Sequence, residues 1–283
     1  MLILKVVYVN TMRLAVYIGK DSGEQDNRVK GLLQTLREAG VQLSVLAYGE
    51  APSSEIDMLL SVGGDGTFLY SAKLVKDSGI PVLGVNIGRV GFLSENRPED
   101  VADAILAGEY TIEDRTVLKA AVVSSDSSSE IWDYALNEIT VHRTGAAMLG
   151  MDVNIDGVEL PTYWADGLVV STSSGSTAYS LSVGGPIVLP ESKVLIISPI
   201  APHNLNIRPL VVPNTVNLTL KMQSRDGKFA VTADNRTVEV AEDVVLTIGV
   251  AQFSLRRVRL NRSNFITALT EKLHWGEDVR NIR

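Results

Sequence analysis

The sequence predicts an α/β domain with a parallel sheet, followed by a β-rich domain and a final helix that packs back on the first domain. In the amino-terminal part, short apolar segments alternate with helical patterns. From Lys119 onward, many short alternating segments are separated by turn residues, which is typical of a β-rich domain. The last segment has apolar residues at helical spacing. We therefore expect an α/β domain over 1–118, completed by 263–283, and a β-rich domain over 119–262.

The first domain is expected to alternate strands with helices. Such an alternation, with short apolar strands, predicts a parallel sheet that lies between helices. Its predicted strands are 14–19, 41–47, 57–63 and 81–88, its predicted helices are 27–39 and 68–76, and 98–115 predicts a short helix and a turn.

The second domain is predicted as a series of short strands. The run Ser124–Glu130 predicts an exposed hairpin loop. After the last strand, Phe265, Leu269 and Leu273 predict an amphipathic helix with Ser263 as its cap. The predicted strands lie in 119–125, 131–142, 151–157, 166–173, 192–200, 215–222, 228–235 and 244–251.

Composition excludes several classes of protein. The chain has 283 residues, of which 45% are hydrophobic, and its net charge of −7 with no long basic block argues against a nucleic-acid partner. It contains no cysteine, so it has no disulfide framework or thiolate metal site, and the cytoplasm is the default compartment. His142, His203 and His274 show no zinc spacing. No apolar run approaches the roughly 20 residues of a membrane span, and the opening segment 1–10 predicts a buried strand rather than a signal peptide.

A glycine-rich loop follows one of the predicted strands. The segment LLSVGGDGTFLYSA, Leu59–Ala72, runs from an apolar strand into three glycines and one carboxylate, with a helix expected to begin at Thr67 or the residue after it. At this edge of a parallel sheet, the free N–H groups of a helix start are able to bind an anion. The loop therefore predicts a phosphate site, although it lacks the lysine and the wider glycine spacing of a P-loop.

Asp65, within this loop, has two interpretations. Asp-Gly pairs are common turn formers, so Asp65 is either a turn residue in a tight connection or a general base beside the phosphates. The loop alone leaves both interpretations open.

A second candidate site lies in ADGLVVSTSSGSTAYSLSVGGPIV, Ala165–Val188. Tyr179 is able to stack on a flat ring, and Asp166 is able to accept from ribose hydroxyls or a base amine. An ordinary polar loop has a similar composition, but a serine nucleophile is not supported, because no G-x-S-x-G elbow or S-x-x-K pattern is present. Small polar donors lie between two apolar segments at Gly175, Ser176, Thr177 and Ser180.

Five segments, in this order, resemble the NAD kinase family. They are GGDGTFL (63–69), GVNIGRVGFLSE (84–95), ALNEITVHR (135–143), DGLVVSTSSGSTAYSLSVGGPIV (166–188) and APHNLNIRPLVV (201–212). The first segment alone is also similar to diacylglycerol kinases, sphingosine kinases and phosphofructokinases, but the later segments favour NAD kinases. The alternatives are a lipid kinase of the diacylglycerol kinase type and a non-catalytic dinucleotide-binding regulator. The regulator would predict a damaged loop, whereas Asp65 and its glycines are intact.

The resemblance implies phosphorylation of the 2′-hydroxyl of the adenosine ribose of NAD by ATP or a related donor, with Mg²⁺. It implies that Asp65 is the catalytic base, and that the two loops face one another. It also implies a homodimer or homotetramer assembled through the β-rich domain. Phosphate binding is carried over to Gly63, Gly64, Gly66 and Thr67, and NAD binding to Asp65, Gly66, Asn137, Glu138, Asp166, Thr177, Ala178, Tyr179, Ser180, Leu181, Ser182 and Ala201.

The sequence departs from the family pattern at three positions and leaves the metal ligands unidentified. Ser173 and Ser174 stand where the family commonly has proline and threonine, and Trp164 stands where many relatives carry a basic residue. The cation that replaces the P-loop lysine is not identified either. Its candidates are Lys73, Arg89 and Arg208.

Overall fold

The chain forms two compact units. The structure is a computed structural model that describes residues 12–19, 25–88, 91–123 and 128–276. The first unit comprises Met1–Asp114 and Leu255–Arg283, and the second unit comprises Arg115–Ser254. The boundaries predicted from the sequence lie after residues 118 and 262. The predicted opening strand, 1–10, lies outside the described residues.

The first unit is built on one six-stranded sheet in the order β2-β1-β3-β4-β19-β5. The pairs β1/β2, β1/β3, β3/β4 and β4/β19 are all parallel. The late strand β19 thus lies between β4 and β5, far from them in the sequence. The strands are β1 (Arg13–Ile18), β2 (Gln42–Val45), β3 (Met58–Val62), β4 (Val82–Val85), β5 (Tyr110–Arg115) and β19 (Leu255–Leu260).

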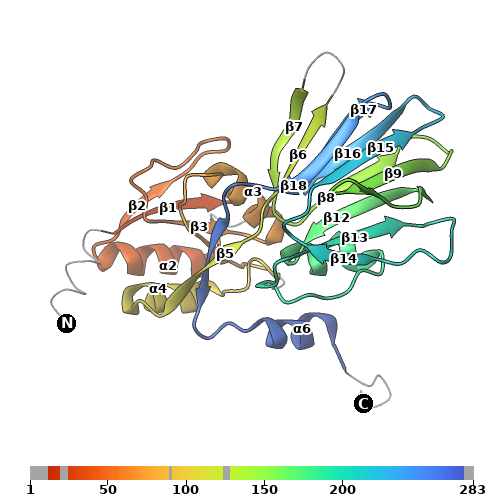
Figure 1. The fold of residues 1–283 in the computed structure, drawn as a ribbon. Coiled ribbons are helices and arrows are strands. Elements are labelled where there is room, and N and C mark those ends of the chain that lie inside the picture. The colour runs from red at the N-terminus through yellow and green to blue at the C-terminus, as the bar shows by residue number, and fades with distance from the viewer. Residues whose placement is uncertain (1–11, 20–24, 89–90, 124–127, 277–283) are drawn as a thin grey trace. The chain divides into compact units, whose positions relative to one another are not determined.

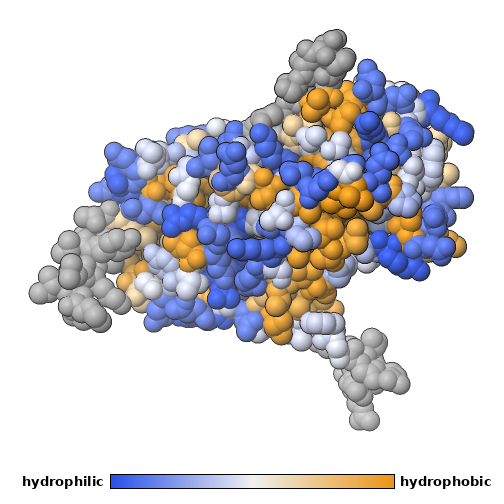
Figure 2. Space-filling model, viewed as in Figure 1, coloured by the Kyte–Doolittle hydropathy of each residue, from blue (hydrophilic) through white to orange (hydrophobic). Residues whose placement is uncertain are grey.

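Helices α2 (Asn27–Glu38), α3 (Asp65–Val75) and α4 (Pro98–Ala107) pack on this sheet. Asp26 caps α2 by accepting from the Arg28 N–H at 2.8 Å. Helices α2 and α4 lie side by side (Figure 1). Their visible outer faces carry mostly hydrophilic side chains (Figure 2), as expected of helices that bury one face.

The final helix α6 (Phe265–Leu273) belongs to the first unit, as expected. Its cap is Asn264, whose side chain accepts from the Ile266 N–H at 2.9 Å, and not the predicted Ser263. The Ser263 hydroxyl instead donates to Asn96 Oδ1 at 3.1 Å. Leu269 is buried, whereas Leu273 is 37% exposed, because the helix ends there.

The second unit contains two antiparallel sheets, in the orders β10-β9-β15-β18-β6-β7 and β14-β13-β12-β8-β16-β17, with β11 paired to β9. The strands are β6 (Leu118–Val123), β7 (Ser128–Ala135), β8 (Glu138–Arg143), β9 (Leu149–Ile155), β10 (Val158–Glu159), β11 (Tyr163–Ala165), β12 (Gly167–Thr172), β13 (Val194–Ile200), β14 (Leu210–Pro213), β15 (Leu218–Gln223), β16 (Lys228–Ala233), β17 (Arg236–Ala241) and β18 (Val245–Val250). Of the predicted loop at 124–130, residues 124–127 lie outside the described residues, and the rest begins β7.

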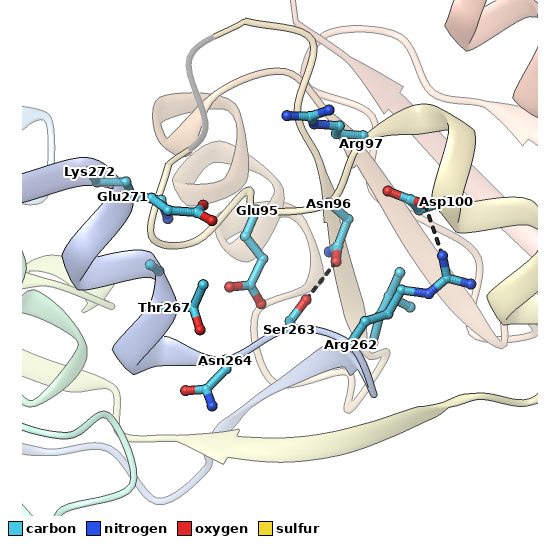
Figure 3. Close-up of a pocket in the computed structure, with 12 residues that line it drawn as sticks. Glu95, Asn96, Arg97, Asp100, Arg262, Ser263, Asn264, Thr267, Glu271 and Lys272 are labelled. Atoms are coloured by element: carbon cyan, nitrogen blue, oxygen red, sulfur yellow. Dashed lines mark hydrogen bonds and ion pairs between the residues drawn. The ribbon is translucent and has the colours of Figure 1, made fainter.

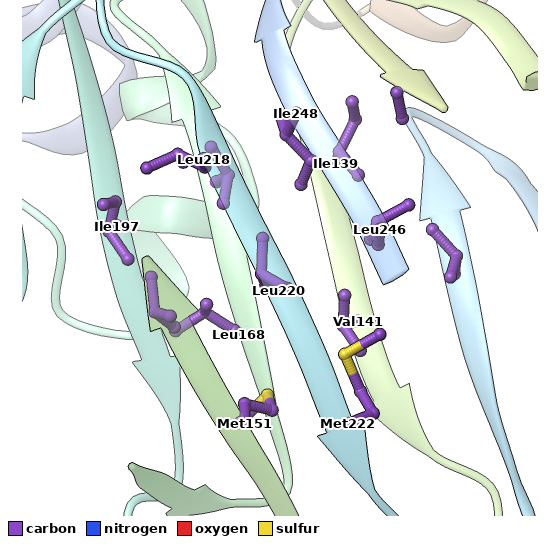
Figure 4. Packing of buried hydrophobic residues seen from close by; sticks show 14 of the residues in the cluster. Ile139, Val141, Met151, Leu168, Ile197, Leu218, Leu220, Met222, Leu246 and Ile248 are labelled. Carbon is purple, nitrogen blue, oxygen red and sulfur yellow. The ribbon is translucent and has the colours of Figure 1, made fainter. Parts of the chain in front are cut away.

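The core of the second unit lies between these sheets. Leu220 and Leu246 from one sheet and Leu168 and Val141 from the other are buried in a single cluster (Figure 4). Every second residue of these strands points into this core, and the residues between them point away from it. On β8 the outward residues include Glu138, which is nevertheless buried.

Candidate active site

The glycine loop directly joins β3 to α3 in the first unit. Gly63 has a φ of 151°, and a Cβ at this position would lie 2.3 Å from Thr67 Oγ1. The Gly63 N–H donates to the Val85 carbonyl on the neighbouring strand at 2.8 Å. Gly63 is therefore required by local packing. Helix α3 begins at Asp65, two residues earlier than predicted, with Gly64 as its N-cap.

Gly64 and Gly66 differ from Gly63, because the protein itself does not require them. Both are exposed, and a Cβ at either position would meet nothing within 4 Å. Within the helix, at Gly66, glycine is less favourable than alanine by about 0.8–1 kcal/mol, whereas at the N-cap, Gly64, glycine is preferred over alanine. Such a cost fits a main chain that a ligand must approach closely at a helix start, where N–H groups are free to bind an anion.

The Asp65 carboxylate binds a second loop through its main-chain N–H groups. Its Oδ2 accepts from Phe92 at 2.8 Å, and its Oδ1 accepts from Leu93 at 3.0 Å and from Ser94 at 2.8 Å. These bonds fix the orientation of both oxygens. Oδ2 receives only one of the three, which leaves it free to accept from a ligand hydroxyl. Asp65 is therefore more than a turn former.

This second loop, Gly91–Ser94, has no role among the predictions from the sequence. A Cβ on Gly91 would lie 1.8 Å from Asp65 Oδ1, so only glycine allows the loop to approach the carboxylate. Asn86 supports the loop, because its side-chain amide donates to the Ser94 carbonyl at 3.0 Å. Gly91 lies in one of the segments that resemble NAD kinases, but nothing local in the sequence pairs it with Asp65.

In the second unit, Asn137 and Glu138 lie where β8 begins. Both are buried, and Glu138 Oε2 has no hydrogen-bond partner among the described residues. Burial, reinforced by the charge of Asp234, raises the pKa of Glu138 to about 8. Asp234 accepts from the Leu136 N–H at 3.0 Å and the Asn137 N–H at 2.8 Å, and burial raises its pKa despite these bonds.

The second glycine-rich segment packs directly on Asn137 and Glu138. It forms a short 3₁₀ helix, η1 (Ser174–Thr177), and a single turn, α5 (Tyr179–Ser182). A Cβ on Gly175 would lie 2.1 Å from the Asn137 carbonyl oxygen, so glycine permits the contact. The Tyr179 ring stacks on His142 with centroids 5.7 Å apart.

The remaining residues of this predicted site differ in exposure. Ser180 is fully buried, and its hydroxyl lies 3.5 Å from that of Ser198, so its side chain contacts the protein. Ser182 is exposed. Thr177, Ala178, Tyr179 and Leu181 are half-buried.

Asp166 is held by Arg143, a residue for which sequence analysis proposed no role. The Arg143 Nε lies 2.6 Å from Asp166 Oδ1, and the Arg143 N–H donates to the Asp166 carbonyl at 3.0 Å. The Asp166 N–H in turn donates to the Ile200 carbonyl at 2.9 Å, which places Ala201 at the same end of the sheet. Ala201 has a φ of 46° and is exposed. β11 carries no basic residue, because Trp164 stands where many relatives have one. The cation beside Asp166 is Arg143 of β8.

The candidates for the cation that replaces the P-loop lysine lie in positions that do not favour this role. Lys73 lies in the last turn of α3, at the opposite end from the glycine loop. The Arg208 guanidinium donates to the carbonyl of Ile207 at 2.9 Å. Arg89 lies outside the described residues.

The described residues contain no group of three or more histidine, aspartate or glutamate side chains arranged to hold a metal ion. Among the helices that the structure describes, none has both the length and the apolar character needed to cross a membrane.

A glycine loop that opens a helix at the edge of a parallel sheet, together with a β-rich second unit, defines a class of nucleotide-binding kinases. The N-terminal domain of ATP-NAD kinases matches residues 7–110, and their C-terminal domain matches residues 136–260. The NAD kinase of Flavobacterium psychrophilum is 44% identical over 229 residues, which are 80% of this chain and 78% of the relative. That of Porphyromonas gingivalis is 37% identical over 95% of this chain and 99% of the relative. The chain belongs to the NAD kinase family.

Solved structures have the same fold. A yeast NADH kinase, solved in complex with NADH, is 23% identical and superposes with a TM-score of 0.84 over 96% of this chain and 90% of its own. An NAD kinase from Archaeoglobus fulgidus, solved in complex with ATP, is 30% identical with a TM-score of 0.74 over 93% of this chain and 99% of its own. The α/β domain, the β-rich domain and the kinase assignment are thus confirmed, and neither the lipid kinase nor the regulator is favoured.

Proposed function

We propose that this kinase transfers the terminal phosphoryl group of ATP to the 2′-hydroxyl of the adenosine ribose of NAD, giving NADP and ADP. The ribose oxygen attacks the γ-phosphorus, the bond between that phosphorus and the bridging oxygen breaks, and the hydroxyl proton passes to Asp65. The observation that carries this proposal is the Asp65 carboxylate, which three main-chain N–H groups orient beside two glycines with open space around them.

Phosphate binding and NAD binding are assigned to different parts of the predicted site. Phosphates are assigned to the main chain of Gly64 and Gly66 at the start of α3, where N–H groups stabilise negative charge. NAD is assigned to the second unit, between Asn137, Glu138 and the η1 and α5 segment. Such a reaction is driven mostly by positioning and charge stabilisation. That the two loops face one another stays a prediction.

Mg²⁺ is expected to bind as a complex with the nucleotide. Mg²⁺ usually binds one or two carboxylates plus substrate phosphates and water, so it needs no cluster of three protein carboxylates. When bound, the ion neutralises phosphate charge. We also propose a cytoplasmic enzyme that assembles as a homodimer or homotetramer through its second unit.

The test is NADP formation from NAD, ATP and Mg²⁺ by the wild type and by Asp65→Asn. The amide keeps the size of the side chain but cannot take the proton, so turnover should fall by about a hundredfold or more. NAD should still bind, which calorimetry measures. The matched control, Asp103→Asn, changes an exposed aspartate of α4 in the same unit and should keep full turnover.

Two results would contradict the proposal. Wild-type protein that makes no NADP with any phosphoryl donor would exclude the kinase reaction. Near-normal turnover of Asp65→Asn would mean that Asp65 only holds the loop Gly91–Ser94.

A further inference from the structure

Helix α6 contacts the loop that binds Asp65. The Lys272 ammonium donates to the Gly91 carbonyl oxygen and lies 4.3 Å from the centroid of the Phe92 ring. The Phe265 ring, on the first turn of the same helix, lies 6.0 Å from the Phe92 ring. One helix therefore contacts both the main chain and the aromatic side chain of this loop.

Lys272 and Asp65 bind the two ends of a single peptide group. The Gly91 carbonyl and the Phe92 N–H belong to the peptide that joins these residues. Its oxygen accepts from Lys272, and its N–H donates to Asp65 Oδ2 at 2.8 Å. A cation at the carbonyl polarises the peptide and strengthens its N–H as a donor, because hydrogen bonds in a chain reinforce one another. The oxygen that this N–H orients is also the one left free to take a proton.

We propose that Lys272 is a positioning residue for the phosphoryl transfer, acting through the Gly91–Phe92 peptide to hold Asp65 Oδ2 in place. The inference rests on the proposed function. It adds to that function a residue of α6, the last helix that the structure describes. Lys272 contacts the loop and not the reacting atoms. It is therefore distinct from the unidentified cation beside the phosphates.

The surroundings of Lys272 fit this role. Burial lowers its pKa, while the charges of Glu95 and Asp65 act in the opposite direction. Glu95 is paired with Arg257 at 2.6 Å, and the contacts of the ammonium among the described residues are with the carbonyl and the ring. A cation over an aromatic face gains about 0.5–2 kcal/mol, depending on its desolvation.

A cavity of about 210 Å³ separates the rest of α6 from the chain that follows the loop. Figure 3 shows Thr267, Glu271 and Lys272 of α6 on one side of it and Glu95 and Asn96 on the other. Lys272 and Phe265 are the residues of α6 for which the structure describes a hydrogen bond or ring contact with this loop. Changing Lys272 should therefore loosen the loop without disturbing Leu269, which is buried on the same helix.

The experiment compares Lys272→Met with Lys272→Arg in the full-length protein. Methionine keeps a long flexible side chain over Phe92 but has no donor, whereas arginine keeps both a donor and a charge. We expect kcat to fall about tenfold in Lys272→Met, since small misplacements of catalytic groups cost up to about a hundredfold. KM for NAD and for ATP should stay within about twofold, and Lys272→Arg should recover most of the turnover. Lys30→Met, on the exposed face of α2, is the matched control.

Amide hydrogen exchange gives a second readout that does not depend on activity. The N–H groups of Phe92, Leu93 and Ser94 should exchange at least several-fold faster in Lys272→Met and at the wild-type rate in Lys30→Met. Wild-type kcat, or unchanged exchange, in Lys272→Met would overturn the proposal, as would equal losses in the methionine and arginine variants. If the wild type makes no NADP, the proposed function fails, and exchange alone still decides whether Lys272 holds the loop.

Discussion

Glu138 shows how the environment of one residue sets its chemistry. Its carboxyl is buried, Oε2 has no partner among the described residues, and Asp234 lies close enough to raise its pKa further. A carboxyl with a pKa of about 8 is mostly neutral at pH 7, so it is able to donate as well as accept a hydrogen bond. This is a suitable group to meet the hydroxyls of a nucleotide ribose.

The raised pKa predicts how stability depends on pH. The folded protein binds a proton at Glu138 up to about pH 8, whereas an exposed glutamate loses it near 4.5, so the stabilisation is full below 4.5 and is lost as the pH rises through 8. In Glu138→Gln the side chain is neutral at every pH. The free energy of unfolding, measured by urea at pH 5, 7 and 9, should therefore fall less steeply with pH than in the wild type, by about 4 kcal/mol over this range. Equal slopes would show that Glu138 is charged in the folded protein.

At the scale of elements, the start of α3 combines a glycine that packing requires with glycines that it does not. Gly63→Ala would place a methyl group 2.3 Å from Thr67 Oγ1, so it should destabilise the protein. Gly66→Ala meets open space inside a helix, so it should stabilise the protein by about 0.5–1 kcal/mol. The same methyl group would stand where the phosphates are proposed to approach, and KM for ATP should rise severalfold.

Thermal unfolding and steady-state kinetics on the two alanine variants measure these opposite effects. A Gly66→Ala protein that is more stable and has an unchanged KM for ATP would contradict the proposed phosphate site. A less stable one would mean that Gly66 has a role in folding.

Local patterns in the sequence predicted most elements, because periodicity and turn residues are properties of short segments. The glycine loop and the final helix were found in this way. The partners of Asp65 were not, since Phe92, Leu93 and Ser94 bind it with main-chain N–H groups that leave no mark on residue type. The pair of Arg143 with Asp166 was missed for a related reason, because strand pairing brings these distant residues together.

At the scale of the whole molecule, sequence analysis placed β19 with the β-rich domain. Its residues, Leu255–Leu260, form a short segment of apolar and basic residues that directly follows the strands of that domain. β19 belongs to the first unit because it pairs in parallel with β4. Local patterns in a single sequence do not reveal such a pairing between distant segments. The segment that follows the second unit therefore supplies a strand that completes the sheet of the first unit.

This closure predicts which pieces fold alone. Residues 1–114 lack the strand between β4 and β5, so alone they should be unfolded by circular dichroism and thermal melting. Joining 1–114 to 255–283 through a short glycine-serine linker should restore cooperative unfolding, because β5 and β19 are neighbours in the sheet. Residues 115–254 contain their own core and should fold alone. A stable 1–114 fragment would show that β19 is dispensable.

The position of β19 also sets the order of events during synthesis on the ribosome. Domains usually fold as units, the amino-terminal one first, while the chain emerges at about 5–20 residues per second. Here the first unit must wait for the whole second unit to be translated, which takes on the order of ten seconds. The segment that carries Asp65 thus emerges early but gains its last strand, and the helix that bears Lys272, only after the second unit has been translated. A nascent chain that stops before Leu255 should therefore have no kinase activity.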